Sequence, residues 1–382
     1  SEKDVKKKTI LVIGDWFIDE NWLMAKHNTY SSSHIGDIHY LSRHDTIDKR
    51  MTSLCGVPEI IEALKSNIGE YSFIGFGVWN KNDDKILQCV LCPNKDSQDK
   101  IKLMTPFTLR GLKDINETGK RMCPYSKQKC TYQPELKNLA PEKEESSTNR
   151  IIRVFEGHGG GQPHLLYRFD WELPVSKNLD YKPFQKSIKT KDVAAIVIDD
   201  HNKGVITETT IEQLVKALGE KESKKIKWYV RSKMDNPSWL ESLKKHKITV
   251  RLRIIDHKLA LYRKGPRLWR YGKVLGRASL ELLGELSGSI VFEHGDEKGH
   301  RDGLPAERVA VLFDDNTVIA KDGDKCFNLY NPPGPKQLIN IGRTTIFFSS
   351  LIHQDIKEPN QRSFGSHCSC ALQCAFEWSK NA

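Results

Sequence analysis

Two acidic segments, each directly after a predicted strand, carry side chains suited to binding a polar ligand. They read Gly14-Asp15-Trp16-Phe17-Ile18-Asp19-Glu20 and Asp199-Asp200-His201-Asn202-Lys203-Gly204. In an open α/β sheet, ligands bind at the edge where the strands end. We therefore expect a polyhydroxylated, anionic small molecule at this edge, because carboxylates accept hydrogen bonds from hydroxyl groups and a lysine attracts negative charge. The expected ligand-binding side chains are those of Asp15, Asp19, Asp200 and Lys203.

The first acidic segment also has a purely structural interpretation. Aspartate is favoured in the first turn of a helix, where it faces the positive end of the helix dipole. The residues alone do not decide between a helix start at 14–20 and a ligand-binding edge.

Hydrophobic periodicity predicts the elements that must position these segments. Short apolar runs predict strands at 8–14, 71–77, 192–198, 226–230, 250–255 and 289–292. Helical spacing predicts helices at 56–66, 82–91, 207–218, 237–245, 278–287, 344–352 and about 368–380, with Thr207 as an N-cap. Hairpins are expected at 151–170 and 309–320. The alternation predicts an α/β fold with a mostly parallel central sheet flanked by helices.

The chain divides into a core and two additions. We expect an α/β core at 1–116 and 171–382, and an insertion or flexible loop at 117–150, which contains three prolines and a charged run. Residues 151–170 are expected to form a β-hairpin lid. Its glycine run at 157–161 opens a strand rather than a helix, which favours a turn over a phosphate-binding loop.

Composition limits the classes of partner. The 382 residues include 60 Lys and Arg against 49 Asp and Glu, a formal net charge of +11. This excess favours an anionic partner, either a phosphorylated ligand, a nucleic acid or an acidic protein, although it also serves solubility. No apolar run reaches the roughly 20 residues that span a bilayer. We expect a cytoplasmic protein without a membrane segment.

Seven of the nine cysteines form two notable groups. Cys89, Cys92, Cys123 and Cys130 could hold one tetrahedral zinc ion as two pairs, although the spacing of the second pair is wide. The alternative is separate free thiols. Cys368, Cys370 and Cys374 lie in a predicted helix, where we expect buried thiols of the core.

The two acidic segments resemble motifs of the ribokinase/PfkB family of carbohydrate kinases, most closely bacterial heptose-phosphate kinase domains. The stretch ILVIGDWFIDENW is similar to the strand and G-D-x-x-x-D-x-Y-W motif of those kinases, and Asp200, Lys203 and Gly204 match S-D-Y-x-K-G. The segment Leu166-Tyr167-Arg168-Phe169-Asp170 is similar to L-x-R-x-D. The likeness covers roughly 8–110 and 150–380.

The resemblance implies a ribokinase-like fold with a small β lid, a sugar-phosphate or nucleotide ligand, and ATP with Mg²⁺. It places Gly56 in a substrate-binding turn. It assigns nucleotide or phosphate binding to Lys233, Gly295, Gly299, Gly342 and Arg343. The β lid of this family commonly covers the substrate or pairs two subunits, so a homo-oligomer or a protein partner at the lid is expected.

Three segments that the family uses for phosphoryl transfer are altered. Where the family reads G-A-G-D at the start of a late helix, this chain has Thr344 in place of the catalytic Asp. The N-x-x-E motif is missing after 250–255, and Arg231-Ser232-Lys233 replaces Asp-Pro-Lys. Loss of a general base costs about 10²–10⁴-fold in rate.

We therefore expect a degenerate sugar-kinase homologue, a pseudokinase, that acts through ligand or partner binding. One alternative is an active ATP-dependent sugar or sugar-phosphate kinase with a rearranged base. The other is a basic interaction module within a larger protein or nucleic-acid assembly.

Overall fold

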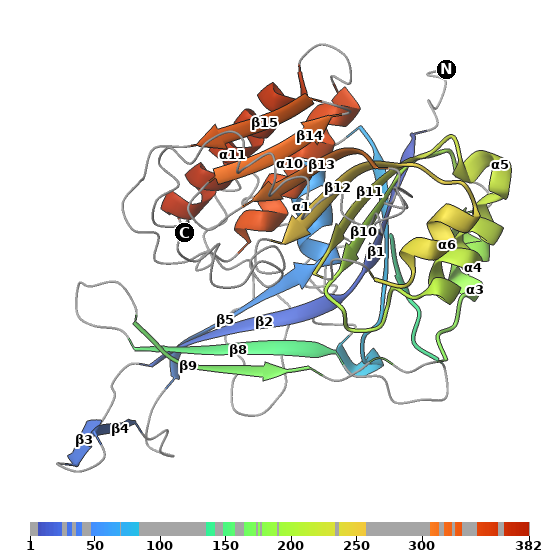
Figure 1. Cartoon of the computed structure of the whole chain (residues 1–382). Coiled ribbons are helices and arrows are strands. Elements are labelled where there is room, and N and C mark those ends of the chain that lie inside the picture. Colours follow the sequence, from blue (N-terminus) through green and yellow to red (C-terminus); the bar gives the residue numbers. More distant parts are fainter. Residues whose placement is uncertain are drawn as a thin grey trace, which may run out of the picture.

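The computed structural model of the chain describes residues 7–24, 29–32, 36–39, 47–68, 70–83, 135–141, 148–156, 164–172, 175, 178–188, 191–233, 237–256, 306–312, 317–322, 325–330, 342–357 and 363–381. A large sheet with helices on both faces forms the body of the molecule, and a smaller sheet extends from one end of it (Figure 1). The predicted segments 84–91, 278–287 and 289–292 lie outside the described residues. None of the helices in the described parts is long and apolar enough to cross a membrane.

Within the described residues, the main sheet contains nine strands in the order β15-β14-β13-β12-β11-β10-β1-β6-β7. The strands from β13 to β7 run parallel, whereas β14 and β15 are antiparallel additions at one edge. The prediction of a mostly parallel sheet is therefore confirmed. The strands are β1 (Thr9–Gly14), β6 (Ser72–Gly77), β7 (Glu135–Asn138), β10 (Val193–Asp200), β11 (Lys227–Ser232), β12 (Val250–Asp256), β13 (Ala306–Leu312), β14 (Thr317–Asp322) and β15 (Lys325–Tyr330).

Helices cover both faces of the main sheet because its central strands are apolar on both faces. In β1, Ile10 and Val12 pack under α1 (Val57–Asn67), α10 (Arg343–Lys357) and α11 (Phe364–Asn381). Leu11 and Ile13 pack on the opposite face, with α3 (Lys182–Ile188), α4 (Glu208–Leu218) and α6 (Leu240–Lys245). The short α5 (Glu220–Ser223) follows α4, and η1 (Lys81–Asp83) follows β6. Thr207 caps α4 as predicted, since its side chain accepts a hydrogen bond from the Thr210 N–H at 3.1 Å.

The second sheet contains β2 (Trp16–Met24), β5 (Ile47–Gly56), β8 (Asn149–Glu156) and β9 (His164–Trp171), in the order β5-β2-β8-β9. The antiparallel pair β8–β9 confirms the hairpin predicted at 151–170 and shows that it belongs to a larger sheet. The helix interpretation of 14–20 is wrong. Residues from Trp16 onward form a strand, because β5 and β8 supply backbone partners on its two sides. A separate ribbon pairs β3 (Thr29–Ser32) with β4 (Gly36–His39).

The structure corrects one part of the expected insertion. Residues Glu135–Asn138, inside the range 117–150, form β7 and pair in parallel with β6 at the edge of the main sheet. Leu139 and Ala140, which follow, are buried in the core. A strand of four residues gives little periodic signal, so the sequence did not distinguish it from a loop. The further division into core, insertion and lid stays a prediction.

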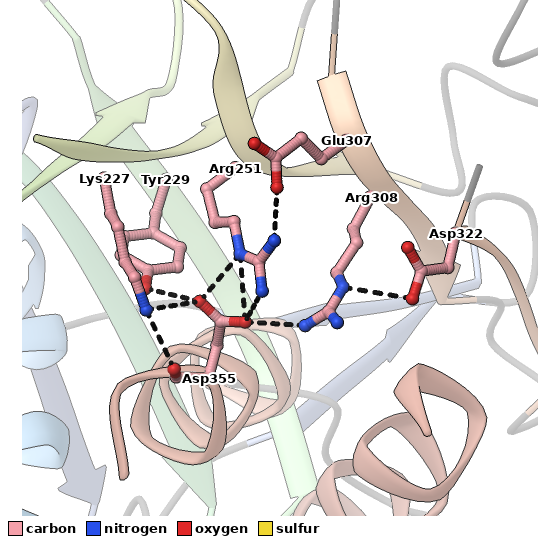
Figure 2. Close-up of polar contacts among 7 residues, drawn as sticks. All are labelled: Lys227, Tyr229, Arg251, Glu307, Arg308, Asp322 and Asp355. Carbon is pink, nitrogen blue, oxygen red and sulfur yellow. Dashed lines mark hydrogen bonds and ion pairs between the residues drawn. The ribbon is translucent and has the colours of Figure 1, made fainter. Parts of the chain in front are cut away.

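A buried ionic cluster holds the C-terminal part of α10 against the amino-terminal edge of the main sheet (Figure 2). The carboxylate of Asp355 accepts hydrogen bonds from Tyr229 Oη at 2.8 Å, Arg251 Nη2 at 2.8 Å and Arg308 Nη1 at 2.6 Å. Lys227 Nζ donates to the Asp355 carbonyl oxygen at 3.1 Å. We call this group the Asp355 cluster; Glu307 and Asp322 complete it by pairing with Arg251 and Arg308. The cluster fixes α10, whose N-terminus lies at the opposite, carboxyl-terminal edge of the sheet.

Candidate ligand site at the carboxyl edge of the main sheet

Asp15 occupies the point where the chain passes from the main sheet to the second sheet. Its Oδ2 accepts hydrogen bonds from the backbone N–H groups of His201 at 2.7 Å and Lys203 at 3.2 Å. The side chain is fully buried. Its other carboxylate oxygen, Oδ1, has no hydrogen-bond partner among the described residues. A buried acceptor without a partner is costly, so Oδ1 is an unsatisfied polar atom at this edge of the sheet.

The protonation of Asp15 is tuned toward neutral pH. Burial raises the pKa of Asp15 to about 7, and the charges of Asp200 and Asp199 act in the same direction. The backbone N–H groups of Lys203 and His201 oppose this shift. A carboxyl group that titrates near neutral pH can either accept a hydrogen bond from a hydroxyl or donate one to it.

Gly56 closes the turn around Asp15. It precedes α1 with a φ of 75°, in the left-handed region, and the Val57 N–H donates to the Asp15 carbonyl at 3.2 Å. A Cβ atom at Gly56 would lie 2.1 Å from that carbonyl oxygen, so no other residue fits without a backbone shift. The structure thus brings together Asp15 and Gly56, which the sequence placed in one site.

A buried arginine that the sequence did not assign to the site organises its centre. Arg231, near the end of β11, donates from Nε and Nη2 to the two carboxylate oxygens of Asp199 at 2.6 and 2.8 Å. Its Nη1 donates to Thr345 Oγ1 at 2.9 Å, and that hydroxyl donates to Glu59 Oε2 at 3.0 Å. This chain of contacts links β10 and β11 to α10 and α1. The signal for Arg231 in the sequence is a charged residue at the end of an apolar strand. It stands where the family resemblance expects Asp-Pro-Lys.

Burial and ion pairing have opposing effects on the pKa values of the carboxyl groups in this network. Burial alone would raise the pKa of Asp199, but the charge of Arg231, and then that of His201, hold the pKa of this carboxyl well below its usual range. Burial lowers the pKa of His201, whose Nε2 lies 3.1 Å from Asp199 Oδ2. Burial raises the pKa of Glu59 to about 7, against the opposing effects of Arg231 and Thr345. The carboxyl group of Asp199 is therefore favoured in its ionised form, whereas the pKa values of Glu59 and Asp15 are both raised to about 7.

Two of the predicted ligand residues are held by other side chains. Asp19 is buried and paired with Arg153 of β8, and it accepts a hydrogen bond from Cys55 Sγ at 3.4 Å. The carboxylate of Asp200 accepts hydrogen bonds from Trp239 Nε1 at 2.8 Å and Ser232 Oγ at 3.2 Å. These contacts give both carboxylates structural partners, and their roles toward a ligand stay predictions.

The two predicted lysines follow neighbouring strands: Lys203 lies in the loop after β10, and Lys233 directly follows β11. Lys203 is half-buried, and its Nζ pairs with Glu172, next to the end of β9. Lys233 is exposed, and its backbone N–H donates to the Asp200 carbonyl at 2.9 Å. Lys203 thus connects the loop after β10 to the second sheet at the rim of the site.

The start of α10 forms the remaining wall. Gly342 has a φ of 77°, and the helix begins at Arg343. The first turn contains no acidic residue, and Thr344 is half-buried within it. Backbone N–H groups at a helix N-terminus favour anions, so this wall suits a phosphate group. The helix predicted at 344–352 is confirmed, and the degenerate base at Thr344 stays a prediction.

Some predicted site residues lie outside the described residues: Gly295, Gly299, Cys89, Cys92, Cys123 and Cys130. In the described parts, no group of three or more His, Cys, Asp or Glu side chains is arranged to hold a metal ion. Asp199 is paired with Arg231. Because Mg²⁺ is usually held by one or two carboxylates together with substrate phosphates, its binding here stays a prediction.

Comparison with solved structures shows which proteins share this fold. Phosphofructokinase-2 from Escherichia coli in complex with fructose-6-phosphate superimposes with a TM-score of 0.55 and 10% identity, over 97% of this chain and 93% of that chain. A possible 1-phosphofructokinase from Thermotoga maritima gives 0.57 and 11%, over 97% and 92%. The tetrameric inhibited form of the E. coli enzyme gives 0.53 and 11%, over 98% and 97%.

Sequence comparison adds no closer assignment. No protein-family model matches the chain, and no curated protein matches it significantly. At about one identical residue in ten, the likeness to the phosphofructokinases shows the fold. The chain has the ribokinase-like fold of sugar kinases, as its sequence predicted.

Proposed function

We propose that the chain is a degenerate sugar-kinase homologue that binds a phosphorylated, polyhydroxylated ligand at the carboxyl edge of the main sheet. It transfers phosphoryl groups poorly or not at all. The observation that carries this proposal is the first turn of α10, which has Thr344 at the expected position of the base and contains no acidic residue. A threonine hydroxyl does not accept a proton near neutral pH.

Ligand binding is supported by the walls of the site. Asp15 Oδ1 is a buried acceptor without a partner among the described residues, and the N-terminus of α10 offers backbone N–H groups to an anion. A sugar phosphate combines the hydroxyl and the anionic groups that these two walls would recognise. The E. coli phosphofructokinase-2 structure contains fructose-6-phosphate, which is a ligand of this class. ATP with Mg²⁺ stays a prediction from the family resemblance.

The first test is phosphoryl transfer itself. With Mg-ATP and a panel of sugars and sugar phosphates, we expect turnover at least about 10²-fold below the roughly 1–100 s⁻¹ of ordinary kinases. Thr344→Asp restores a carboxylate at the start of α10 and should raise any residual rate. Thr344→Asn is the matched control, because it has a similar size but no proton-accepting group. Turnover at ordinary kinase rates in the unmodified protein would contradict the proposal.

A second candidate function, an active kinase with a rearranged base, is favoured by Glu59. This carboxyl group has a pKa raised to about 7 by burial and hydrogen-bonds Thr345, the residue after the expected base. If Glu59 accepts the proton, Glu59→Gln should abolish turnover while leaving ligand affinity unchanged, and the rate should rise with pH through about 7. Under the pseudokinase proposal, Glu59→Gln leaves the already low rate unchanged. Single-turnover phosphorylation assays separate the two outcomes.

The second sheet is proposed as an interface with a second copy of the chain. β9 is its edge strand, and Phe169 and Trp171 on it expose 46% and 64% of their surface. Tyr167 and Phe169 stack at 6.2 Å between ring centroids. An open edge strand with exposed aromatic side chains is an aggregation hazard unless it is covered.

We expect an oligomer at micromolar concentration by light scattering, and monomers after the double change Phe169→Ser and Trp171→Ser. Arg168 lies on the same strand and is exposed, but it is charged rather than aromatic. Arg168→Ser is therefore the control and should leave the oligomer intact. A monomeric unmodified protein without a co-purifying partner would contradict this interface. Co-purified nucleic acid, detected by ultraviolet absorbance, would instead favour the third candidate, a basic module in a nucleic-acid assembly.

A further inference from the structure

The helix α11 exposes two cysteines on the face that points away from the core. Its buried face consists of Phe364, Gly365, His367, Cys368, Ala371, Leu372 and Ala375, which recur at helical spacing. Cys368 is a core thiol as predicted, but Cys370 and Cys374 are exposed, so the prediction that all three are buried is wrong. Residues 370 and 374 are one turn apart and therefore share a face. Packing does not require cysteine at either position.

The two exposed thiols contact each other and a hydroxyl of the neighbouring helix. The Cys370 and Cys374 side chains are hydrogen-bonded, and Ser350 of α10 also hydrogen-bonds the Cys374 thiol. Burial, followed by the charge of Cys370, raises the pKa of Cys374, whereas the hydrogen bond from Ser350 acts in the opposite direction. The result is an accessible pair of sulfur atoms at the seam between α10 and α11.

The helix geometry disfavours a disulfide in this pair. Side chains at i and i+4 of a helix have Cβ atoms about 5–6 Å apart, whereas a disulfide requires about 3.5–4.5 Å. Forming the bond would therefore unwind part of α11. A metal ion placed between the sulfur atoms spans a wider gap, because each metal–sulfur bond adds about 2.3 Å.

The number of ligands selects the type of metal. A structural zinc ion is almost always bound by four ligands. No third His, Cys, Asp or Glu joins the two thiols within the described parts of the chain. Thiolates are soft ligands that suit Cu(I), zinc and iron–sulfur clusters. Zinc and iron–sulfur clusters usually take four protein ligands, whereas Cu(I) is stable with two sulfur ligands.

We propose that Cys370 and Cys374 form a two-coordinate site for one Cu(I) ion on the surface of α11. On binding, both S–H protons are released to solvent and two Cu–S bonds form. The ion remains Cu(I), so no electron is transferred and no oxidant is needed. The Ser350 hydroxyl stabilises the Cys374 thiolate by donating a hydrogen bond to it. The site is independent of the ligand site at the carboxyl edge.

Anaerobic titration of the full, reduced chain with Cu(I) against a chromogenic chelator tests this proposal. Because Cys89, Cys92, Cys123 and Cys130 could also bind the ion, the titration is performed in a background in which these four are serine. We expect one tight equivalent per chain. Cys370→Ser and Cys374→Ser, each alone, should weaken it by about 100-fold or more, since the second thiolate binds intramolecularly. Cys55→Ser, which removes a distant thiol, is the control.

The outcomes separate cleanly. Loss of the tight equivalent in both single variants, with retention in the Cys55→Ser control and unchanged circular dichroism, supports the site. An unchanged stoichiometry in the Cys370→Ser/Cys374→Ser double variant would overturn it. Absence of tight Cu(I) binding in the four-serine background would also overturn it. Sugar-phosphate binding should be the same with and without Cu(I).

Discussion

Replacing Arg231 with methionine should lower the free energy of unfolding by about 3–5 kcal/mol, because it leaves the buried carboxylate of Asp199 without its cation. Asp199 is fully buried, and Arg231 contacts both of its oxygens. The same substitution removes the donor to Thr345 and loosens the start of α10. Chemical denaturation at pH 7 measures the change.

A double-mutant cycle distinguishes an unpaired charge from lost packing. Asp199→Asn in the Arg231→Met background should recover part of the loss, since a neutral amide tolerates burial better than a carboxylate. Arg168→Met is the matched control, because Arg168 forms an exposed pair with Asp170 on the second sheet and should cost less than about 1 kcal/mol. Equal losses at positions 231 and 168 would contradict the network described here.

The Asp355 cluster should give the second large effect. Asp355→Asn removes the single carboxylate on which Lys227, Arg251 and Arg308 converge (Figure 2). Because Arg251 and Arg308 keep Glu307 and Asp322 as partners, we expect a loss of about 2–3 kcal/mol at pH 7. Burial alone would raise the pKa of Asp355, but hydrogen bonds and charge from Arg251 lower it overall.

A carboxyl group with a lowered folded-state pKa stabilises the protein above its ordinary pKa and loses that contribution as pH falls. Stability of the unmodified chain should therefore fall with acidification through about pH 4, and Asp355→Asn should flatten that dependence. Glu241→Gln, at an exposed pair with Lys244, is the control and should change stability by less than about 0.5 kcal/mol. An equally steep acid limb in the Asp355→Asn variant would show that other carboxyl groups control it.

The fold was predictable because its strongest signals are local. The apolar runs of β1, β10 and β11 and the helical spacing of α1 and α4 recur in the structure where the sequence predicted them. The strand β2 was not predicted, since its acidic start also fits a helix terminus, and only pairing with β5 and β8 decides its state. β7 was missed because four residues at a sheet edge carry almost no periodicity.

The sequence indicated where in the fold the candidate site would lie, but not which of its side chains contact one another. Asp15 could be placed from its position after a predicted strand, whereas Gly56 and Thr344 were assigned only through the family resemblance. The link from Arg231 through Thr345 to Glu59 joins residues far apart in the chain, and it depends on how α1 and α10 pack against the sheet. The pairing of Asp19 with Arg153 likewise requires the parallel register of β2 and β8. Neither set of contacts can be predicted from the spacing of these residues along the sequence.

Calorimetric titration with a panel of sugar phosphates and the corresponding neutral sugars tests the central claim most directly. We predict that at least one sugar phosphate binds and that its neutral sugar binds more weakly. Asp15→Ala and Lys203→Ala should each reduce the affinity by about 10-fold or more, because each removes a side chain that is proposed to hydrogen-bond the ligand. Lys182→Ala, at an exposed position on α3, should leave the affinity unchanged. Sugar-phosphate binding that is unaffected by both Asp15→Ala and Lys203→Ala would place the ligand elsewhere and contradict the account.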